Sequence, residues 1–261
     1  MKKTLITALA AALLVSFGVS NVLAAGAGKE PPKRNWSTQG PFGKFDRAQL
    51  KRGWQVYSEV CAACHSINQI YYRNLVEIGF SDAEMKQIAA GAEVPAGPNE
   101  DGETHKDGEP IMRAAKPFDK VKMPFPNDNA ARAANGGALP PDLTLMVKAR
   151  HGGADYVYAL LAGYSNAPSG VKVQDGMNYN EYFPGAQLAM ASPLAEDGIE
   201  FADGTKATVS QMAEDVTAFL IWTAEPELED RKRMGIKVLL FLIVLTGMLY
   251  ALKRKIWADL Q

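Results

Sequence analysis

The chain has 261 residues, with 28 Lys and Arg against 29 Asp and Glu, and a formal net charge of −1. This net charge says little about partners by itself, and we expect no nucleic-acid partner. Only two cysteines are present, which excludes a disulfide-stapled scaffold and leaves stability to core packing.

Residues 1–24 have the composition of a secretory signal peptide. Lys2 and Lys3 precede an apolar run over residues 5–19, and small residues follow around Ala24. The run is short for a membrane span, which disfavours an uncleaved anchor. We therefore expect cleavage near Ala25 and export of the chain that follows.

A helix is expected directly before residue 61. Asp46 can cap it, and apolar side chains recur at helical spacing at Leu50, Trp54, Tyr57 and Cys61. Such a helix would bring the first cysteine of the chain to the edge of the core.

Both cysteines belong to the motif Cys61-Ala62-Ala63-Cys64-His65. The pattern is typical of haem c attachment, because each thiol can add to one porphyrin vinyl group and the imidazole can bind the iron. A thioredoxin-like dithiol, half of a zinc site or a structural disulfide would also use this cysteine spacing. No second such pair exists, and only His105 and His151 remain as further imidazoles. We predict one covalently attached haem c, held by Cys61 and Cys64, with His65 as an axial iron ligand.

The middle of the chain is expected to combine loops with short helices. Residues 95–141 contain Gly, Pro, Asn and charges without a sustained period, which indicates an extended insertion. Residues 142–150 and 154–161 show short helical patterns separated by Gly152-Gly153 and closed by Gly163. Strand signals are weak, so the exported domain is predicted to be mainly α-helical with long loops.

Two stretches are acidic and could be either solvated loops or a docking surface for a basic redox partner. The first contains Glu93, Glu100, Asp101, Glu103, Asp107 and Glu109, and the second contains Glu196, Asp197, Glu200 and Asp203.

A six-coordinate haem needs a second axial ligand, and a thioether in that position raises the potential. Met190 lies in a turn-rich segment after Phe183-Pro184-Gly185, which could bring a loop across the ring. Met123 and Met177 are alternatives at this point, whereas Met212 fits the apolar stripe of a helix.

That helix is signalled by a capping pattern of Thr208 and Gln211 and is expected to end at Pro226. Its apolar stripe consists of Met212, Val216, Phe219 and Leu220.

The last feature is the apolar segment 235–252, whose 18 residues would span roughly 27 Å as a helix, close to the thickness of a bilayer core. The alternative is a buried helix of a soluble protein. We expect a signal peptide (1–24), a periplasmic c-type haem domain (25–230), a transmembrane anchor helix (231–252) and a cytoplasmic tail (253–261) in a bacterial inner membrane.

Long blocks of this sequence resemble the cytochrome c1 family. They are, in the order of that family, residues 54–66, 72–76, 130–143, 149–157, 182–190 and 231–235. The resemblance implies a class I cytochrome c-like haem domain with long loop insertions and one C-terminal transmembrane helix. It also implies that Met190 is the second axial ligand and that Arg150 and Tyr156 lie beside the haem, Arg150 near a propionate.

The resemblance further implies an electron-transfer subunit of ubiquinol–cytochrome c oxidoreductase, respiratory complex III. Its haem would accept one electron from the Rieske iron–sulfur protein and pass it to a c-type cytochrome. The chain would belong to a dimeric complex with cytochrome b, and its anchor would contact membrane lipid. No catalytic side chain is expected. The alternatives are a membrane-anchored monohaem carrier or terminal-oxidase subunit, and a thiol–disulfide oxidoreductase using Cys61 and Cys64. Met190 follows His65 by 125 positions, more than a minimal carrier needs.

Overall fold

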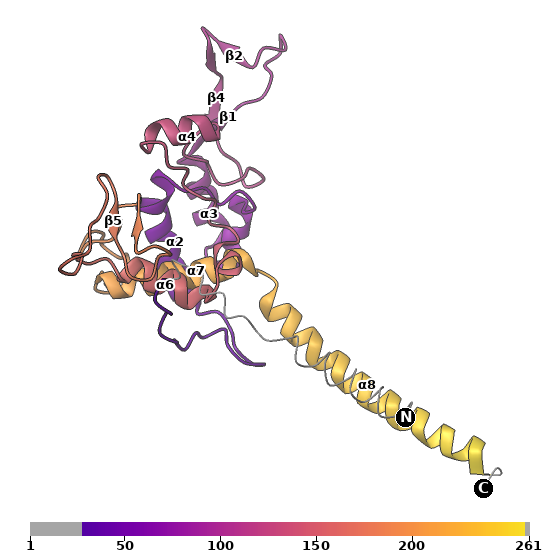
Figure 1. Cartoon of the computed structure of the whole chain (residues 1–261). Coiled ribbons are helices and arrows are strands. Elements are labelled where there is room, and N and C mark those ends of the chain that lie inside the picture. The colour runs from indigo at the N-terminus through magenta and orange to yellow at the C-terminus, as the bar shows by residue number, and fades with distance from the viewer. Residues whose placement is uncertain (1–27, 259–261) are drawn as a thin grey trace, which may run out of the picture.

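The computed structural model describes residues 28–258 (Figure 1). The expected signal peptide and its cleavage site lie outside this range. Most regular structure in the described residues is helical, as predicted. The helices are α2 (Arg47–Glu59), η1 (Cys61–Ala63), η2 (Tyr72–Ile78), α3 (Asp82–Ala90), α4 (Asp128–Ala134), α5 (Met146–Ala149), α6 (Gly153–Ala162), α7 (Val209–Ala224) and α8 (Leu228–Trp257), of which η1 and η2 are 3-10 helices.

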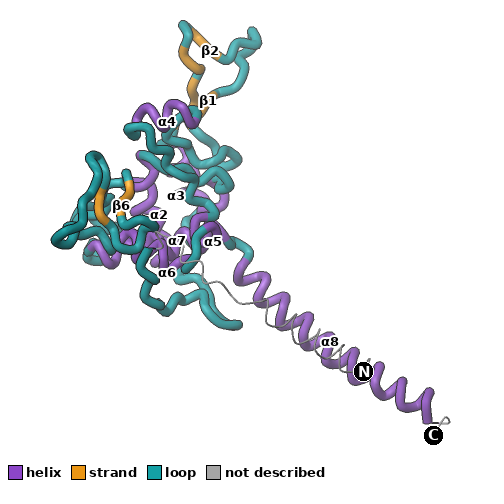
Figure 2. The backbone as a smooth tube through the Cα atoms, viewed as in Figure 1, coloured by secondary structure: helices purple, strands orange, loops and turns teal. Residues whose placement is uncertain are grey.

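Three short antiparallel strand pairs accompany these helices. The pairs are β1 (Glu93–Pro95) with β4 (Met112–Ala114), β2 (His105–Lys106) with β3 (Glu109–Pro110), and β5 (Asn178–Tyr179) with β6 (Gln187–Leu188). In register, Val94 faces Arg113, His105 faces Pro110 and Asn178 faces Leu188. Figure 1 shows the β1–β4 arm at the end of the molecule opposite α8, and Figure 2 shows long loops between the other elements.

Helices α2 and α7 form the centre of the core. Asp46 caps α2 by accepting from the amides of Ala48 and Gln49, as predicted. Thr208 caps α7 by accepting from the amide of Gln211, but the Gln211 side chain donates to Asp215, so the predicted capping box is only half formed. Between the helices, four aromatic side chains pack with ring centroids 5.6 to 5.9 Å apart, namely Trp54, Tyr57, Phe219 and Trp222.

The two helices cross at Gly53. A Cβ atom at this position would lie 2.2 Å from the Asp215 carbonyl oxygen and 2.6 Å from the Phe219 Cβ, so only glycine permits the approach. Beside the crossing, the Arg52 guanidinium donates to the fully buried Asp215 carboxylate at 2.8 Å. The buried charge is therefore paired, and α2 is held in one position on α7.

The prediction of a helix over residues 142–150 is only partly right. Only residues 146–149 are helical, as α5, because the Asp142 carboxylate accepts hydrogen bonds from other backbone and side-chain groups, described below. The second expected helix, over 154–161, matches α6, which ends before Gly163.

Helix α8 follows α7 after three residues and stays exposed to its end. Its most apolar 18-residue window has no buried residue, so the alternative of a buried helix in a soluble protein is wrong. The helix begins at Leu228, three residues before the expected span, and continues to Trp257. It is the only helix of the described residues that is long and apolar enough to cross a membrane.

Candidate haem site

The two cysteines and the histidine follow directly from α2. The chain leaves that helix at Val60 and enters η1, where the amides of Cys64 and His65 both donate to the Cys61 carbonyl, at 3.1 and 2.9 Å. This turn gathers both thiols and the imidazole within one short segment. Both cysteines are free thiols, Cys61 packed against the core and Cys64 exposed to solvent.

The environment of Cys61 disfavours the thioredoxin-like alternative. Burial, with a further contribution from Cys64, raises the pKa of the Cys61 thiol to about 12. A dithiol oxidoreductase needs a lowered thiol pKa, because the thiolate is the nucleophile. The zinc alternative also lacks support, since no three His, Cys, Asp or Glu side chains within residues 28–258 form a group suited to a metal ion.

The His65 ring is held by a main-chain group from a distant segment. Its Nδ1 lies 2.8 Å from the Pro141 carbonyl oxygen. Because a carbonyl can only accept, Nδ1 carries the proton and Nε2 keeps its lone pair for a metal. Burial lowers the pKa of His65, although the Pro141 carbonyl and Asp142 oppose this, so the imidazole is neutral at pH 7.

A carboxylate next to Pro141 fixes the two segments together. Asp142 accepts from the Ser66 hydroxyl at 2.8 Å, from the Asn68 amide at 2.7 Å and from the Thr144 amide at 3.0 Å. The Leu143 amide also donates to the Ser66 carbonyl at 2.8 Å. The roles of Pro141 and Asp142 were not predicted from the sequence, where their only signal was membership of the block 130–143.

Met190 lies in a half-buried loop between two buried leucines, Leu188 and Leu194. The Tyr164 hydroxyl donates to the Met190 carbonyl at 3.1 Å. Burial raises the pKa of Tyr164, and nearby Tyr156 contributes in the same direction. Tyr164 is therefore a third residue whose role was not predicted from the sequence. Within the described residues, no hydrogen bond or ion pair joins residues 188–194 to residues 61–65, so the structure does not by itself pair Met190 with His65.

The other methionine candidates differ in their surroundings. Met212 is 1% exposed in the core, as its position in the α7 stripe predicted. Met123 is 49% exposed, and Met177 is half-buried.

Arg150 and Tyr156 are brought near one another. Tyr156 is buried in α6, and burial raises its pKa while the Arg150 cation acts in the opposite direction. The Arg150 side chain is exposed and donates to the Ala149 carbonyl at 3.2 Å. The neighbouring His151 is exposed.

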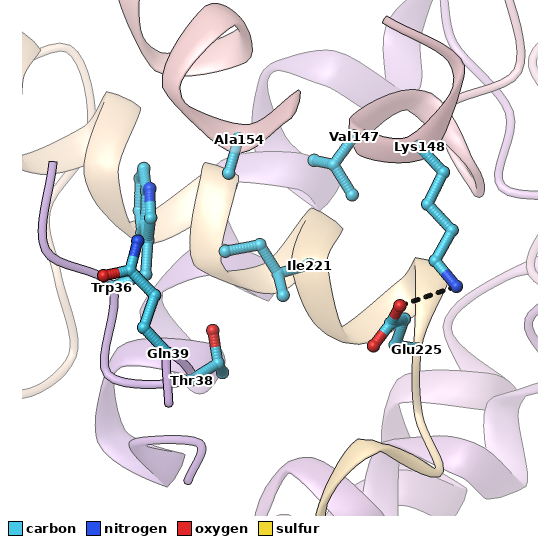
Figure 3. Close-up of a pocket in the computed structure, with 8 residues that line it drawn as sticks. All are labelled: Trp36, Thr38, Gln39, Val147, Lys148, Ala154, Ile221 and Glu225. Atoms are coloured by element: carbon cyan, nitrogen blue, oxygen red, sulfur yellow. Dashed lines mark ion pairs between the residues drawn. The ribbon is translucent and has the colours of Figure 1, made fainter. Parts of the chain in front are cut away.

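A hollow of about 230 Å³ lies elsewhere, between the segment before α2 and helices α5, α6 and α7 (Figure 3). Trp36, Val147, Ala154 and Ile221 provide apolar walls, and Lys148 pairs with Glu225 at 2.7 Å at one side. It contains none of the predicted haem residues, so we do not assign it to the haem.

The sequence matches the Cytochrome C1 family over residues 36–260. The chain belongs to the cytochrome c1 family. A cytochrome c1 of Rhodospirillum rubrum is 47% identical over 245 residues, which cover 88% of each chain. The protein named "Cytochrome c1, heme protein, mitochondrial" of Saccharomyces cerevisiae is 48% identical over 239 residues, covering 91% of this chain and 75% of the relative. The "Cytochrome b-c1 complex catalytic subunit, mitochondrial" of Candida albicans is 45% identical over 260 residues, covering 98% and 88%.

The residues of this family member fit a covalent haem. The donor set contains two unpaired thiols three positions apart and an imidazole whose Nε2 is left free by the bond to Pro141. A half-buried thioether such as that of Met190 is the kind of second ligand that such an iron takes. The resemblance seen in the sequence is thus confirmed at the level of the family, and the individual ligand roles stay predictions.

Proposed function

We propose that this chain is the haem-bearing electron-transfer subunit of a cytochrome bc1 complex, respiratory complex III. Its haem c would receive one electron from the Rieske iron–sulfur protein and pass it to a c-type cytochrome. The observation that carries the proposal is the His65 ring, fixed by Pro141 with Nε2 free, directly beside two unpaired thiols. Membership of the cytochrome c1 family and the name of the Candida relative support the assignment to that complex.

Each residue would have a separate task. Cys61 and Cys64 would hold the porphyrin as thioethers, while His65 Nε2 and the Met190 sulfur would be the two protein ligands of the iron. When bound, the haem iron supplies one-electron redox chemistry. Two axial protein ligands leave no open position for a substrate, which is why no catalytic side chain is assigned.

The surroundings would tune that chemistry. The Arg150 guanidinium would offset the charge of a propionate, and a fixed cation there changes the relative stability of the two iron states. Tyr156 is buried next to Arg150 and would exclude water from the same side. Tyr156, together with Leu188 and Leu194, which flank the Met190 loop, would make the pocket largely apolar. The whole would correspond to a class I cytochrome c-like domain with long loop insertions.

In this proposal α8 is the membrane anchor. Its exposed apolar side chains suit lipid, and the haem domain of residues 25–230 would lie in the periplasm, with residues 253–261 in the cytoplasm. This places the protein in a bacterial inner membrane as a single-pass protein.

The junction between the haem domain and α8 favours a fixed subunit over a mobile tethered carrier. Only residues 225–227 separate α7 from α8. Glu225 pairs with Lys148 at 2.7 Å and with Arg231 of α8 at 2.5 Å, and Arg47 of α2 pairs with Glu229 at 2.9 Å. A carrier that must reach its partner on a tether needs a flexible linker. Here the ion pairs fix the domain relative to the first turns of α8, as suits a subunit of a complex with cytochrome b.

The β1–β4 arm, which carries the first acidic stretch, is the proposed docking surface for the electron acceptor. Its carboxylates between residues 100 and 109 are exposed, and the arm lies at the end opposite α8 (Figure 1). The second acidic stretch has internal roles, because Asp203 pairs with Arg52 and Glu196 accepts from the Val209 amide at the start of α7. Only the first stretch is therefore proposed to face a basic cytochrome.

The test combines haem content, ligation and co-purification. We expect one covalent haem per chain in a pyridine haemochrome assay, with cytochrome b and the Rieske protein retained on mild detergent purification. Met190→Leu should remove the His/Met spectrum and lower the midpoint potential, whereas the control Met177→Leu should change neither. A chain without covalent haem refutes a cytochrome function, and a haem-loaded chain that always purifies alone supports the carrier alternative.

A further inference from the structure

A loop of residues 38–44, here called the Phe42 loop, presents an apolar side chain to the outside. Phe42 is 78% exposed, the highest value among the large hydrophobic residues of the described chain, including those of α8. Leaving an aromatic ring in water forfeits about 1.5–3 kcal/mol of burial free energy. Outside α8, an aromatic ring this exposed indicates contact with a partner surface.

The Phe42 loop is tied to α8. The Lys232 ammonium donates to the carbonyls of Thr38, at 2.5 Å, and Gly43, at 3.3 Å. Immediately after the loop, the Phe45 amide donates to Glu229 at 2.7 Å, and the Phe45 ring is buried. The first turns of α8 thus fix both ends of the loop.

The loop is also closed on itself. The Lys44 amide donates to the Ser37 carbonyl at 2.9 Å, and Gly40 has a φ of +71°, which only glycine adopts without strain. A Cβ at Gly43 would lie 2.2 Å from the Gln39 carbonyl oxygen, so this position also requires glycine. Phe42 is therefore presented at the tip of a rigid turn.

The position of the loop along α8 decides what it faces. Lys232 precedes the apolar run at Gly235 by three residues, which is about 4.5 Å of helix. In Figure 1 the violet loop before α2 lies below the folded body, on the side from which α8 extends. A side chain at this level lies where the helix passes from headgroups into hydrocarbon, the depth that aromatic residues favour. At the other end of α8, Trp257 is exposed at the matching position.

We infer that the Phe42 loop is a second membrane contact, with the Phe42 ring inserted among the lipid headgroups of the outer leaflet beside α8. The inference rests on the proposed membrane span of α8, to whose first turns the loop is hydrogen-bonded. The neighbouring Lys44 is exposed and can pair with lipid phosphate. A single helix leaves a domain free to tilt over the bilayer, whereas a second point of contact at one side restricts that tilt.

The test places an environment-sensitive label at residue 42. In the full haem-loaded chain both native cysteines are consumed by the porphyrin, so a Phe42→Cys variant offers one thiol for an NBD fluorophore. The labelled chain is placed in phospholipid nanodiscs and titrated with aqueous iodide, or assembled with lipids brominated near the headgroup. Asp101→Cys, on the β1–β4 arm, is the aqueous control, and Leu242→Cys, within α8, is the bilayer control.

We expect the label at residue 42 to be quenched by brominated lipid and to be several-fold less sensitive to iodide than the label at residue 101. Iodide sensitivity equal to that at residue 101 overturns the inference. A label shielded from both quenchers would place the loop against protein and would overturn it as well. If the label at residue 242 is as sensitive to iodide as the label at residue 101, the proposed span of α8 fails too, which separates the two outcomes.

Discussion

Replacing Tyr164 by Phe tests whether this hydroxyl holds the Met190 loop in place. In the described part of the chain, the Tyr164 hydroxyl is the one hydrogen-bond donor to the Met190 carbonyl, at 3.1 Å in a partly buried setting. Removing it deletes a bond of about 1 kcal/mol and leaves a half-buried carbonyl without a partner, which costs about 1–3 kcal/mol. If Met190 is the iron ligand, as proposed, its side chain should therefore be released more readily, while the fold stays intact.

A penalty of about 1.4 kcal/mol is a tenfold change in the equilibrium between bound and released methionine. If release is coupled to one deprotonation, the alkaline midpoint of ligand exchange should fall by about one pH unit. The assay is a pH titration of the oxidised protein, followed by the long-wavelength absorption band of methionine-ligated ferric haem.

Tyr158→Phe is the matched control. The Tyr158 hydroxyl lies 2.9 Å from the Ser210 hydroxyl, between α6 and α7 and away from the Met190 loop. Its loss should lower global stability to a similar extent but leave the alkaline midpoint unchanged. The reasoning is refuted if Tyr164→Phe leaves the midpoint in place, or if both variants shift it equally.

Three further predictions concern the fold and the docking surface. Gly53→Ala should destabilise the chain by about 2 kcal/mol or more in a urea titration, because the clash with Asp215 outweighs the gain in helix propensity, whereas Gly91→Ala, with only ordinary contacts, should be nearly neutral. Reversing the carboxylates within residues 100–109 should slow reduction of a basic cytochrome c and flatten its salt dependence, and an unchanged rate would show that the arm is only a solvated loop. The Thr205 amide and then the Arg52 guanidinium lower the pKa of Asp203 to about 2, so the stability it adds above pH ~4 is lost as the pH falls towards 2. Asp203→Asn should show a smaller loss of unfolding free energy over that range, measured as urea midpoints at each pH.

Local signals in the sequence located the helices that carry the site. Asp46 and Thr208 are short-range caps, and their hydrogen bonds reach only two or three residues along the chain. The apolar run of α8 likewise needs no tertiary context to be recognised. These features are predictable because their energetics depend on neighbours in sequence.

Long-range contacts were not predictable in the same way. The bonds from residues 65–68 to Pro141 and Asp142 join positions more than 70 residues apart, and no local pattern distinguishes them. Asp142 was expected in a helix because its sequence neighbours suit one, but its carboxylate accepts hydrogen bonds from the Ser66 hydroxyl and the Asn68 amide of another segment.

The β2–β3 hairpin was also not predicted, for a different reason. Asp107 and Gly108 both have positive φ, at 55° and 86°, and connect the two strands as a two-residue turn. An Asp-Gly pair is a recognised hairpin signal, so the sequence contained the information. The strands of only two residues each gave no periodicity to accompany it.

The bond from His65 to Pro141 has a consequence for mutational tolerance. Since the acceptor is a main-chain carbonyl, no substitution at residue 141 can delete it. The ring orientation is therefore set by the path of the backbone and is shielded from most single-residue changes at the contact itself. A changed orientation of the His65 ring would instead arise from substitution of Asp142, whose side chain holds that backbone path in place. Attempts to retune the proposed haem centre by mutation are best directed there.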